Sequence, residues 1–287
     1  MAVDFQAVTF NLFHDYPQCR HIDRRLALLE AELARTAPEV VFLQEASVSL
    51  LYGHLAERLV DGLRQHDLRY DLHYAPANGS IARGEVFEEG SAILSRWPIT
   101  DAAVRELAAG RRIEREYQGY RFVERRIAIA ATLRIEDGVE IEAVGAHVTD
   151  APAEGEVRPR QWQIEDLERF VAERGVKRER VIVGGDFNAR PEAEEIAWLR
   201  ERGFVDVCEA SDPGATNDPD DRDLESPNDS SRHRIDYLFV GPGRRSWGVR
   251  ATRLFLARPA EVEPGRYLWA SDHNGISADL FLDSSAA

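Results

Sequence analysis

The chain has 287 residues, with 36 basic and 51 acidic side chains and a formal net charge of −15. Hydrophobic residues make up 44% and charged residues 30%, which is ordinary for a folded, water-exposed protein. No apolar run approaches the roughly 20 residues that span a bilayer, so we expect no membrane-spanning helix. The acidic balance argues mildly against tight non-specific binding of nucleic acid.

The N-terminus and the cysteines point to a reducing compartment. The first residues, Met-Ala-Val-Asp-Phe-Gln, lack the basic region and apolar segment of a secretory signal. Cys19 and Cys208 are the only cysteines, too few for a disulfide framework or a thiolate metal cluster. We therefore expect free thiols in a cytoplasmic protein; oligomeric state stays open. With no repeat and no linker, we predict one domain over 1–287, with its core at about 5–283.

Short apolar runs rich in Val, Ile and Phe alternate with helical stretches. Strands are predicted over 7–12, 40–44, 91–95, 126–135, 140–148, 180–184, 235–240 and 252–256. Helices are predicted over 22–35, 50–65, 160–174 and 192–202. The Asp-Gly pair within 136–139 predicts a hairpin between two strands. Together these features predict an α/β fold of two packed mixed sheets, covered outside by helices.

Two segments have the composition of long loops. Residues 74–90 contain Pro76, Asn78, Gly79 and Gly84, and residues 211–232 are crowded with Asp, Pro, Asn and Ser. Long loops inside compact domains tend to be functional or disordered. The second segment precedes a predicted strand, so it either overhangs the end of the sheets or is a mobile solvated loop.

The run Val-Ile-Val-Gly-Gly-Asp-Phe-Asn at 181–188 is the most informative stretch of the chain. A strand buried on both faces is continuously apolar, and catalytic and binding residues are often found at the carboxyl ends of such strands. Asp186 and Asn188 are two residues apart, so in an extended chain they point the same way. They are suited to contact one substrate or ion together, although Asp and Asn also serve in ordinary turns.

Further polar side chains lie at or near the ends of other predicted strands. A carboxylate within or beside an apolar strand is costly unless it is paired or bound to a cation. Its repetition along the chain is hard to explain as surface decoration and favours a catalytic site. These further residues are Asn11, Glu45, His147, Asp236, Asp272 and His273.

In the order of these residues, the chain resembles the endonuclease/exonuclease/phosphatase family, whose fold is the four-layered α/β sandwich of DNase I. The resemblance runs from Asn11 to His273, and His147 is similar to the histidine of the DNase-like and sphingomyelinase-like branches. Abasic-site endonucleases commonly have tyrosine there. The specific signal is the combination Gln44-Glu45, Gly185-Asp186-Phe187-Asn188, Arg234-Ile235-Asp236-Tyr237 and Ser271-Asp272-His273.

The resemblance implies a metal-dependent phosphoester hydrolase. Glu45 would hold Mg²⁺, for which Mn²⁺ is a possible substitute, and Asn11 would supply an amide oxygen or orient the ligands. Asp272 would coordinate the ion directly or through water. Magnesium prefers oxygen ligands and keeps several waters, so few protein ligands are needed.

The remaining residues would act on water and phosphate. Asp186 would position or deprotonate the attacking water, and Asn188 would donate to a phosphate oxygen. His273 is the other candidate base, or a cationic phosphate clamp, with its imidazole oriented by Asp236. His147 is either the general acid toward the leaving oxygen or a hydrogen-bond donor to the phosphate.

Substrate recognition is less defined. The segment 105–126 carries seven arginines that either contact phosphate or form salt bridges on a solvated edge. Candidate substrate-binding residues are Thr149, Arg234 and Trp269, although Trp269 is also a possible core anchor.

The leading hypothesis is a Mg²⁺-dependent phosphoesterase acting on a small phosphodiester or phosphomonoester. A DNA or RNA endonuclease is the alternative within the same chemistry, with nucleic acid possible but not favoured. A catalytically silent, phosphate-binding scaffold is the alternative from another class.

Overall fold

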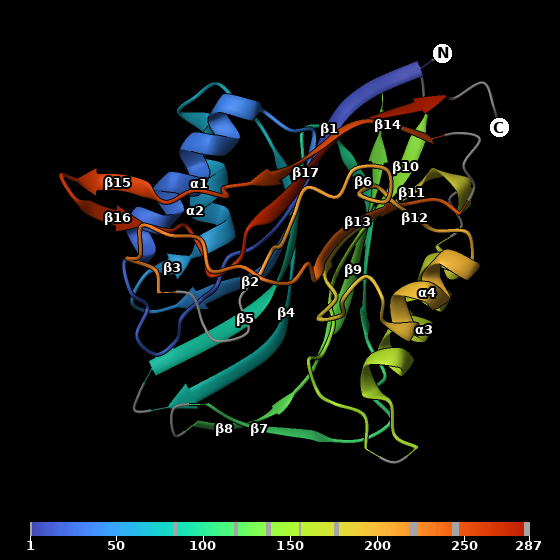
Figure 1. Cartoon of the computed structure of the whole chain (residues 1–287), viewed down its shortest axis with the longest axis horizontal. Helices are drawn as coiled ribbons and strands as arrows, with labels where there is room; N and C mark the ends of the chain where they lie inside the picture. Colours follow the sequence, from blue (N-terminus) through green and yellow to red (C-terminus); the bar gives the residue numbers. More distant parts are fainter. Residues whose placement is uncertain are drawn as a thin grey trace.

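The computed structural model describes residues 2–82, 85–117, 120–135, 139–154, 156–174, 178–217, 223–242 and 247–283. Two large sheets pack face to face in the centre, and helices cover their outer faces (Figure 1). Helices α1 (Ile22–Thr36) and α2 (Leu55–Arg64) cover one sheet. Helices α3 (Pro159–Glu173) and α4 (Glu194–Glu201) cover the other. The predicted four-layer α/β sandwich is confirmed.

In the described residues, the first sheet has seven strands, in the order β14-β17-β1-β2-β5-β4 with β3 beside β2. Only the β1–β2 pair is parallel. The strands are β1 (Ala2–Asn11), β2 (Val40–Ser49), β3 (Gly53–His54), β4 (Asp71–Ala82), β5 (Glu85–Ser95), β14 (Trp247–Phe255) and β17 (Gly275–Asp283).

The second sheet has six strands in the described part of the chain, in the order β12-β13-β11-β10-β9-β6. Here β10 and β11 are the parallel pair. Its strands are β6 (Ile99–Glu106), β9 (Ile127–Arg134), β10 (Glu140–His147), β11 (Val181–Asp186), β12 (Val205–Asp206) and β13 (Asp236–Val240).

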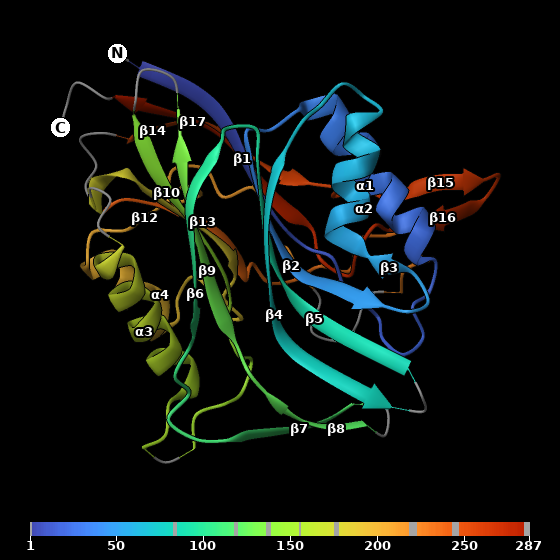
Figure 2. The ribbon, with the colours of Figure 1, turned by 180° about the vertical axis from the view of Figure 1, so that it is seen from behind.

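Smaller elements lie around the two sheets. The hairpin of β7 (Ile113–Tyr117) and β8 (Tyr120–Glu124) lies across one end of the sandwich, at the bottom of Figures 1 and 2. Strands β15 (Ala260–Glu263) and β16 (Arg266–Leu268) form a second hairpin beside α1, and a short 3-10 helix, η2 (Arg178–Arg180), precedes β11.

Alternation of side chains along the central strands builds separate core layers. In β2, Val40 and Phe42 face the second sheet, whereas Val41 and Leu43 face α1 and α2. Strand β11 repeats this pattern, with Ile182 between the sheets and its neighbours packed under α3 and α4. A strand covered on both faces must be apolar at every position, which is why these runs do not alternate with polar residues.

The prediction of a loop over 74–90 is wrong, because this region forms most of the β4–β5 hairpin. Pro76 is compatible with a strand here because β4 lies at the edge of its sheet, with a register shift between Pro76 and Asn78. The predicted hairpin between β9 and β10 is confirmed by their antiparallel pairing, while its residues 136–138 lie outside the described residues.

The helix predicted over 50–65 begins only at Leu55. Gly53 has a φ of 77° and starts the short strand β3, so Leu50 and Leu51 lie in a turn and are exposed. The bounds of the other three predicted helices lie within two residues of those in the structure. No helix in the described ranges has both the length and the apolar character needed to cross a membrane.

Replacement of Gly184 by Ala is expected to destabilise the fold, because a Cβ built on Gly184 would overlap the Phe42 ring of the facing sheet. Overpacking of this kind costs about 1–3 kcal/mol. Thermal or urea denaturation would measure the loss. Gly79→Ala is the matched control, because its Cβ would meet only the carbonyl oxygen of Phe87 at 3.5 Å. Equal stability of the two variants would contradict the proposed steric role of Gly184.

Candidate active site

Three residues of the second sheet lie side by side across adjacent strands. His147 ends β10 and is in register with Asp186 at the end of the parallel strand β11. Asp186 is in turn in register with Asp236 at the start of the antiparallel strand β13. In β11 and β13, alternate residues such as Ile182 and Leu238 face the first sheet, so Asp186 and Asp236 face it too.

The first sheet contributes Asn11 and Glu45, which lie where the parallel pairing of β1 with β2 ends. Asn11 is the last residue of β1 and is in register with Gln44 of β2. Glu45 has a φ of 53° and lies at a register shift between β2 and β5, which turns its side chain toward the site instead of the helices. This bulge explains why strict alternation does not apply to Glu45.

Asn11 connects the acids of the two sheets. Its amide nitrogen donates to Glu45 Oε1 and to Asp186 Oδ2, both at 3.2 Å. Its amide oxygen accepts the backbone N–H of Phe13 at 2.9 Å, which fixes the orientation of the amide. Of the two roles expected for Asn11, this geometry favours orienting the carboxylates over offering an oxygen to an ion.

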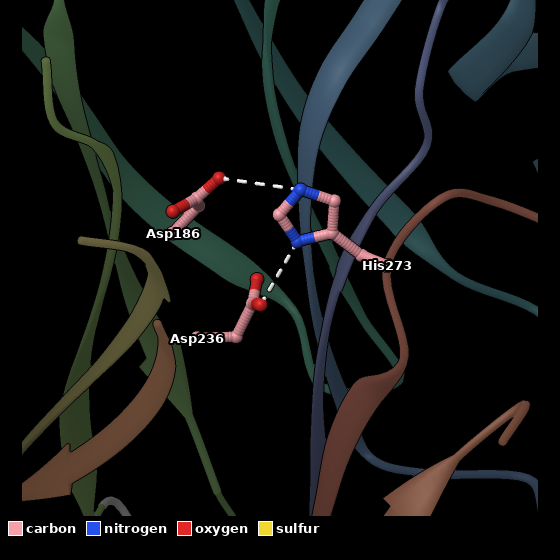
Figure 3. Close-up of side chains that lie close together, drawn as sticks. All are labelled: Asp186, Asp236 and His273. Atoms are coloured by element: carbon pink, nitrogen blue, oxygen red, sulfur yellow. Dashed lines mark hydrogen bonds and ion pairs between the residues drawn. The ribbon is translucent and has the colours of Figure 1, made fainter. Parts of the chain in front are cut away.

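His273 lies just before β17 and faces the acids of the second sheet (Figure 3). Its Nδ1 is 2.9 Å from Asp236 Oδ2, and its Nε2 is 3.8 Å from Asp186 Oδ2. Burial disfavours the protonated ring, but Asp236, Asp272 and Asp186 outweigh burial and raise the pKa of His273 well above its usual range. The three carboxylates therefore favour the protonated form of the ring.

His147 has the opposite surroundings. Its Nδ1 is 2.9 Å from a guanidinium nitrogen of Arg126, and its Nε2 is 3.6 Å from Asp186 Oδ2. Burial, reinforced by the positive charge of Arg126, lowers the pKa of His147 well below its usual range. Two imidazoles whose pKa values are shifted in opposite directions thus approach the same carboxylate oxygen from different sheets.

Two of the buried carboxylates have surroundings that make them resist ionisation. Burial and the neighbouring Asp236 raise the pKa of Asp186 to about 7. Burial raises the pKa of Asp272 to about 6, with Glu45 contributing. Within the described residues, one group of three possible metal-ligating side chains has its ligand atoms within 4.8 Å: Asp186, Asp236 and His273. Such an excess of buried acid is suited to a cation.

Arg25 of α1 ties together the segment after β1 and the segment before β17. Its side chain is 2% exposed and donates to the carbonyl oxygens of Leu12 at 3.1 Å, Phe13 at 2.8 Å and Ala270 at 3.3 Å. Asn11 and Asp272 lie one or two residues from these carbonyls. Arg25 thereby positions residues of the site without entering it.

A cavity of about 410 Å³ opens beside Glu45 and Asp272. Its walls combine aromatic rings with acidic, amide and guanidinium groups. Tyr16 and Phe87 stack with ring centroids 4.1 Å apart and form one side. The full lining is Phe13, His14, Tyr16, Glu45, Asn78, Gly79, Phe87, Glu89, Arg115, Glu116, Phe122, Glu124, Arg126, Asp150 and Asp272.

Asn188 lies beside Asp186, to which its backbone N–H donates at 2.9 Å. Its side-chain amide donates to the carbonyl of Val148 at 2.9 Å. The other expected substrate-binding residues are occupied within the fold. Arg234 pairs with Asp206 at 2.7 Å, and Thr149 is fully buried and donates to Glu124. The Trp269 ring is 1% exposed, and its indole N–H donates to a backbone carbonyl at 2.8 Å. None of these three lines the cavity.

Sequence reasoning missed His14, Glu89 and Asn217. The backbone N–H of His14 donates to Glu45 Oε2 at 3.1 Å, and Glu89 lines the cavity. The Asn217 amide is 2.9 Å from His273 Nε2. Only Asn217 had a signal, because one of the two interpretations of the segment 211–232 placed it over the end of the sheets.

In the arginine-rich segment 105–126 salt bridges predominate, and contact of an arginine with phosphate stays a prediction. Most of its described arginines form salt bridges on the outside, among them Arg105 with Glu173 and Arg121 with Glu116. Arg115 and Arg126 instead line the cavity. The side chains of Tyr117 and Tyr120 lie outside the described residues.

Many solved structures have a similar fold, and for the three that follow the similarity covers nearly the whole of both chains. An endonuclease/exonuclease/phosphatase family protein from Bacteroides thetaiotaomicron has a TM-score of 0.72 at 18% identity, over 99% of both chains. The mannosyl-6-phosphatase of Bacteroides thetaiotaomicron VPI-5482 has a TM-score of 0.67 at 18% identity, over 96% of this chain and 99% of that one. TDP2 of D. rerio, complexed with a single strand DNA product, has a TM-score of 0.65 at 19% identity, over 96% of this chain and 98% of that one.

At these identities the structural likeness concerns the fold. A comparison with curated proteins gives no match. The sequence model of the Endonuclease/Exonuclease/phosphatase family matches residues 8–273, which include every strand-end residue described above. The chain therefore belongs to the endonuclease/exonuclease/phosphatase family of phosphoester hydrolases.

Proposed function

We propose that this hydrolase is Mg²⁺-dependent and cleaves a small phosphodiester or phosphomonoester by attack of water at phosphorus. One observation carries the proposal. Glu45 and Asp272 line one cavity, and the buried Asp186 and His273 lie next to them. Membership of a hydrolase family argues against the alternative of a catalytically silent, phosphate-binding scaffold.

The donor set suits a hard divalent cation. Glu45 and Asp272 would hold the ion with carboxylate oxygens, the ligand type that Mg²⁺ prefers. The buried Oδ1 of Asp236 accepts no hydrogen bond from the described residues, so this region has unused anionic capacity. When bound, the ion would polarise a phosphoryl oxygen and neutralise the charge that develops during attack.

Asp186 is the better base of the two candidates. Its pKa of about 7 lets the carboxylate accept a proton near neutral pH, whereas the His273 ring is already protonated. Water oxygen bonds to phosphorus while the bond to the leaving oxygen breaks, and the leaving oxygen keeps that electron pair. Asp186 takes the proton of the water, and the leaving oxygen is protonated by the His273 imidazolium or by solvent.

The cavity favours a small substrate over a long polyanion. Its volume of about 410 Å³ is in the range of sites for small molecules. Away from the metal-binding acids, the cavity wall carries four acidic side chains and two arginines, so its net charge disfavours a long polyanion. The acids are Glu89, Glu116, Glu124 and Asp150, and the arginines are Arg115 and Arg126. The likeness to a mannosyl-6-phosphatase makes sugar phosphates the first class to test. The likeness to a DNA-bound structure keeps a nuclease as the second candidate.

The substrate class is tested by a panel at fixed Mg²⁺: hexose 6-phosphates, inositol phosphates, choline phospholipids, RNA and plasmid DNA. We expect kcat/KM to be highest for a small soluble ester. The decisive comparison is release of inorganic phosphate against nicking of the plasmid. Efficient cleavage of nucleic acid with no turnover of the small esters would replace the first candidate with the second.

Asp186→Ala and His273→Ala are each expected to lower kcat by about 10²–10⁴-fold, because they remove the base and the charged phosphate contact. Hydrolysis of bis(4-nitrophenyl) phosphate with Mg²⁺ would measure the loss. Asp61→Ala, an exposed acid paired with Arg64 on α2, is the matched control and should retain wild-type rates. Near-normal turnover by either folded site variant, or full activity in excess chelator, would sink the proposal.

Asp186 should make the metal-free protein less stable as the pH rises from about 4 to 7, and this contribution is measured as the difference between wild type and Asp186→Asn. Over this range folded Asp186, with its pKa of about 7, retains a proton that the unfolded chain has released, because an ordinary Asp has a pKa of about 4. The folded state therefore binds more protons, and stability falls with rising pH. Melting temperatures in chelator would show this slope, and Mg²⁺ should raise them more at about pH 8 than at about pH 5.

Asp186→Asn is the control for this titration. The amide has no proton to lose, so the variant should show a flatter dependence of melting temperature on pH. A wild-type melting temperature that rises over the same range, with no flattening in the variant, would contradict the assignment of the titration to Asp186.

A further inference from the structure

The side chain of Arg126 decides which nitrogen of His147 carries the proton. A guanidinium nitrogen of Arg126 lies 2.9 Å from His147 Nδ1. A guanidinium remains protonated and has donors only, so it cannot accept a hydrogen bond. The imidazole nitrogen must therefore accept with its lone pair. The single proton of a neutral ring is then on Nε2, the nitrogen that points into the site.

Arg126 is held firmly in this position. Its side chain is 12% exposed, with Nη1 3.4 Å from Glu89 Oε1 and Nη2 3.3 Å from Glu124 Oε2. Glu124 is itself fixed, because it accepts from Arg115 Nε at 2.9 Å and from the Thr149 hydroxyl. Rotation of the guanidinium away from the imidazole would break both ion pairs. The tautomer is thus set by a buried network that reaches into the wall of the cavity.

The protonated nitrogen of His147 faces the reacting centre. Nε2 lies 3.6 Å from Asp186 Oδ2, and the Nε2 of His273 lies 3.8 Å from the same oxygen. A phosphoryl group attacked by water beside Asp186 would therefore lie within reach of both rings. His273 Nδ1 lies 2.9 Å from a carboxylate oxygen of Asp236, whereas His147 Nδ1 lies 2.9 Å from a guanidinium nitrogen of Arg126. A carboxylate oxygen of Glu89 is farther from His147 Nδ1, at 3.7 Å, and is itself paired with Arg126. A second positive charge on His147 would lie directly against Arg126.

We propose that Arg126 is a positioning residue that fixes His147 as the neutral Nε2–H tautomer, so that His147 donates a hydrogen bond to a non-bridging phosphoryl oxygen and does not protonate the leaving group. The inference rests on the proposed phosphoesterase function. It decides between the two roles that the sequence left open for His147, and it assigns a role to one arginine of the segment 105–126.

The leaving group separates the two roles. Removal of a general acid harms a poor leaving group far more than a good one, whereas removal of a donor to a non-bridging oxygen harms both alike. We expect His147→Ala to lower kcat/KM for bis(4-nitrophenyl) phosphate and for diphenyl phosphate by the same factor, about 10–100-fold. A loss at least tenfold larger on diphenyl phosphate would overturn the inference.

Two amide variants test the position of the donor. In His147→Gln the side-chain amide nitrogen can lie near the place of Nε2, so this variant should keep kcat/KM within about tenfold of wild type. His147→Asn places its amide near Nδ1 and should fall as low as His147→Ala. Equal, severe losses in both amide variants, with the folded state intact by circular dichroism, would contradict a donor at Nε2.

The tautomer itself is visible without turnover. Nitrogen NMR of the ¹⁵N-histidine-labelled, metal-free protein at neutral pH should show His147 with a protonated Nε2 and an unprotonated Nδ1. Arg126→Met should change this pattern, Arg126→Lys should largely restore it, and Arg112→Met, on the same segment but exposed and paired with Glu114, should not affect it. A wild-type ring protonated at Nδ1 would overturn the inference, whereas an inactive wild type with the expected spectrum would overturn only the proposed function.

Discussion

The contact of Phe42 with Gly184 sets the distance between the two sheets, and the site depends on that distance. The Phe42 ring fills the space that a side chain at Gly184 would occupy, and it also approaches Gly145 of the neighbouring strand. Two residues beyond Gly184, Asp186 comes close enough to accept from Asn11 of the opposite sheet. Glycine at position 184 lets the two sheets approach closely, so that residues of both sheets could contact one phosphate under the proposed function.

Within this frame, the group placed at each imidazole Nδ1 determines the chemistry of the ring. Burial disfavours the charged form of both rings, Arg126 lowers the pKa of His147 further, and Asp236 helps to raise the pKa of His273. The difference between the two rings arises from the neighbouring charges and not from exposure. Under the proposed function, two residues of the same type would supply a cation and a neutral donor to one phosphate.

The polar residues at strand ends could be predicted from the sequence for two reasons. Each follows or interrupts a buried apolar run, and the carboxyl ends of parallel strands meet at one edge. His14, Glu89 and Arg126 could not be found in this way, because their positions depend on which strands pair. The β4–β5 hairpin was missed since Pro76 has the composition of a loop, and only the edge position makes it compatible with a strand. Trp269 and Arg234 lie close in sequence to site residues, yet their partners are within the fold.

The path of the chain places a condition on when activity can arise. Strand β1, which carries Asn11, lies between β2 and the much later β17, and His273 directly precedes β17. During synthesis the segments of a chain emerge in order from the N-terminus, so β1 is made long before the strand that covers its other edge. Until that strand docks, β1 has an open edge and Asp236 has no imidazole to orient. Under the proposed function, a nascent chain therefore lacks a complete site until β17 pairs with β1.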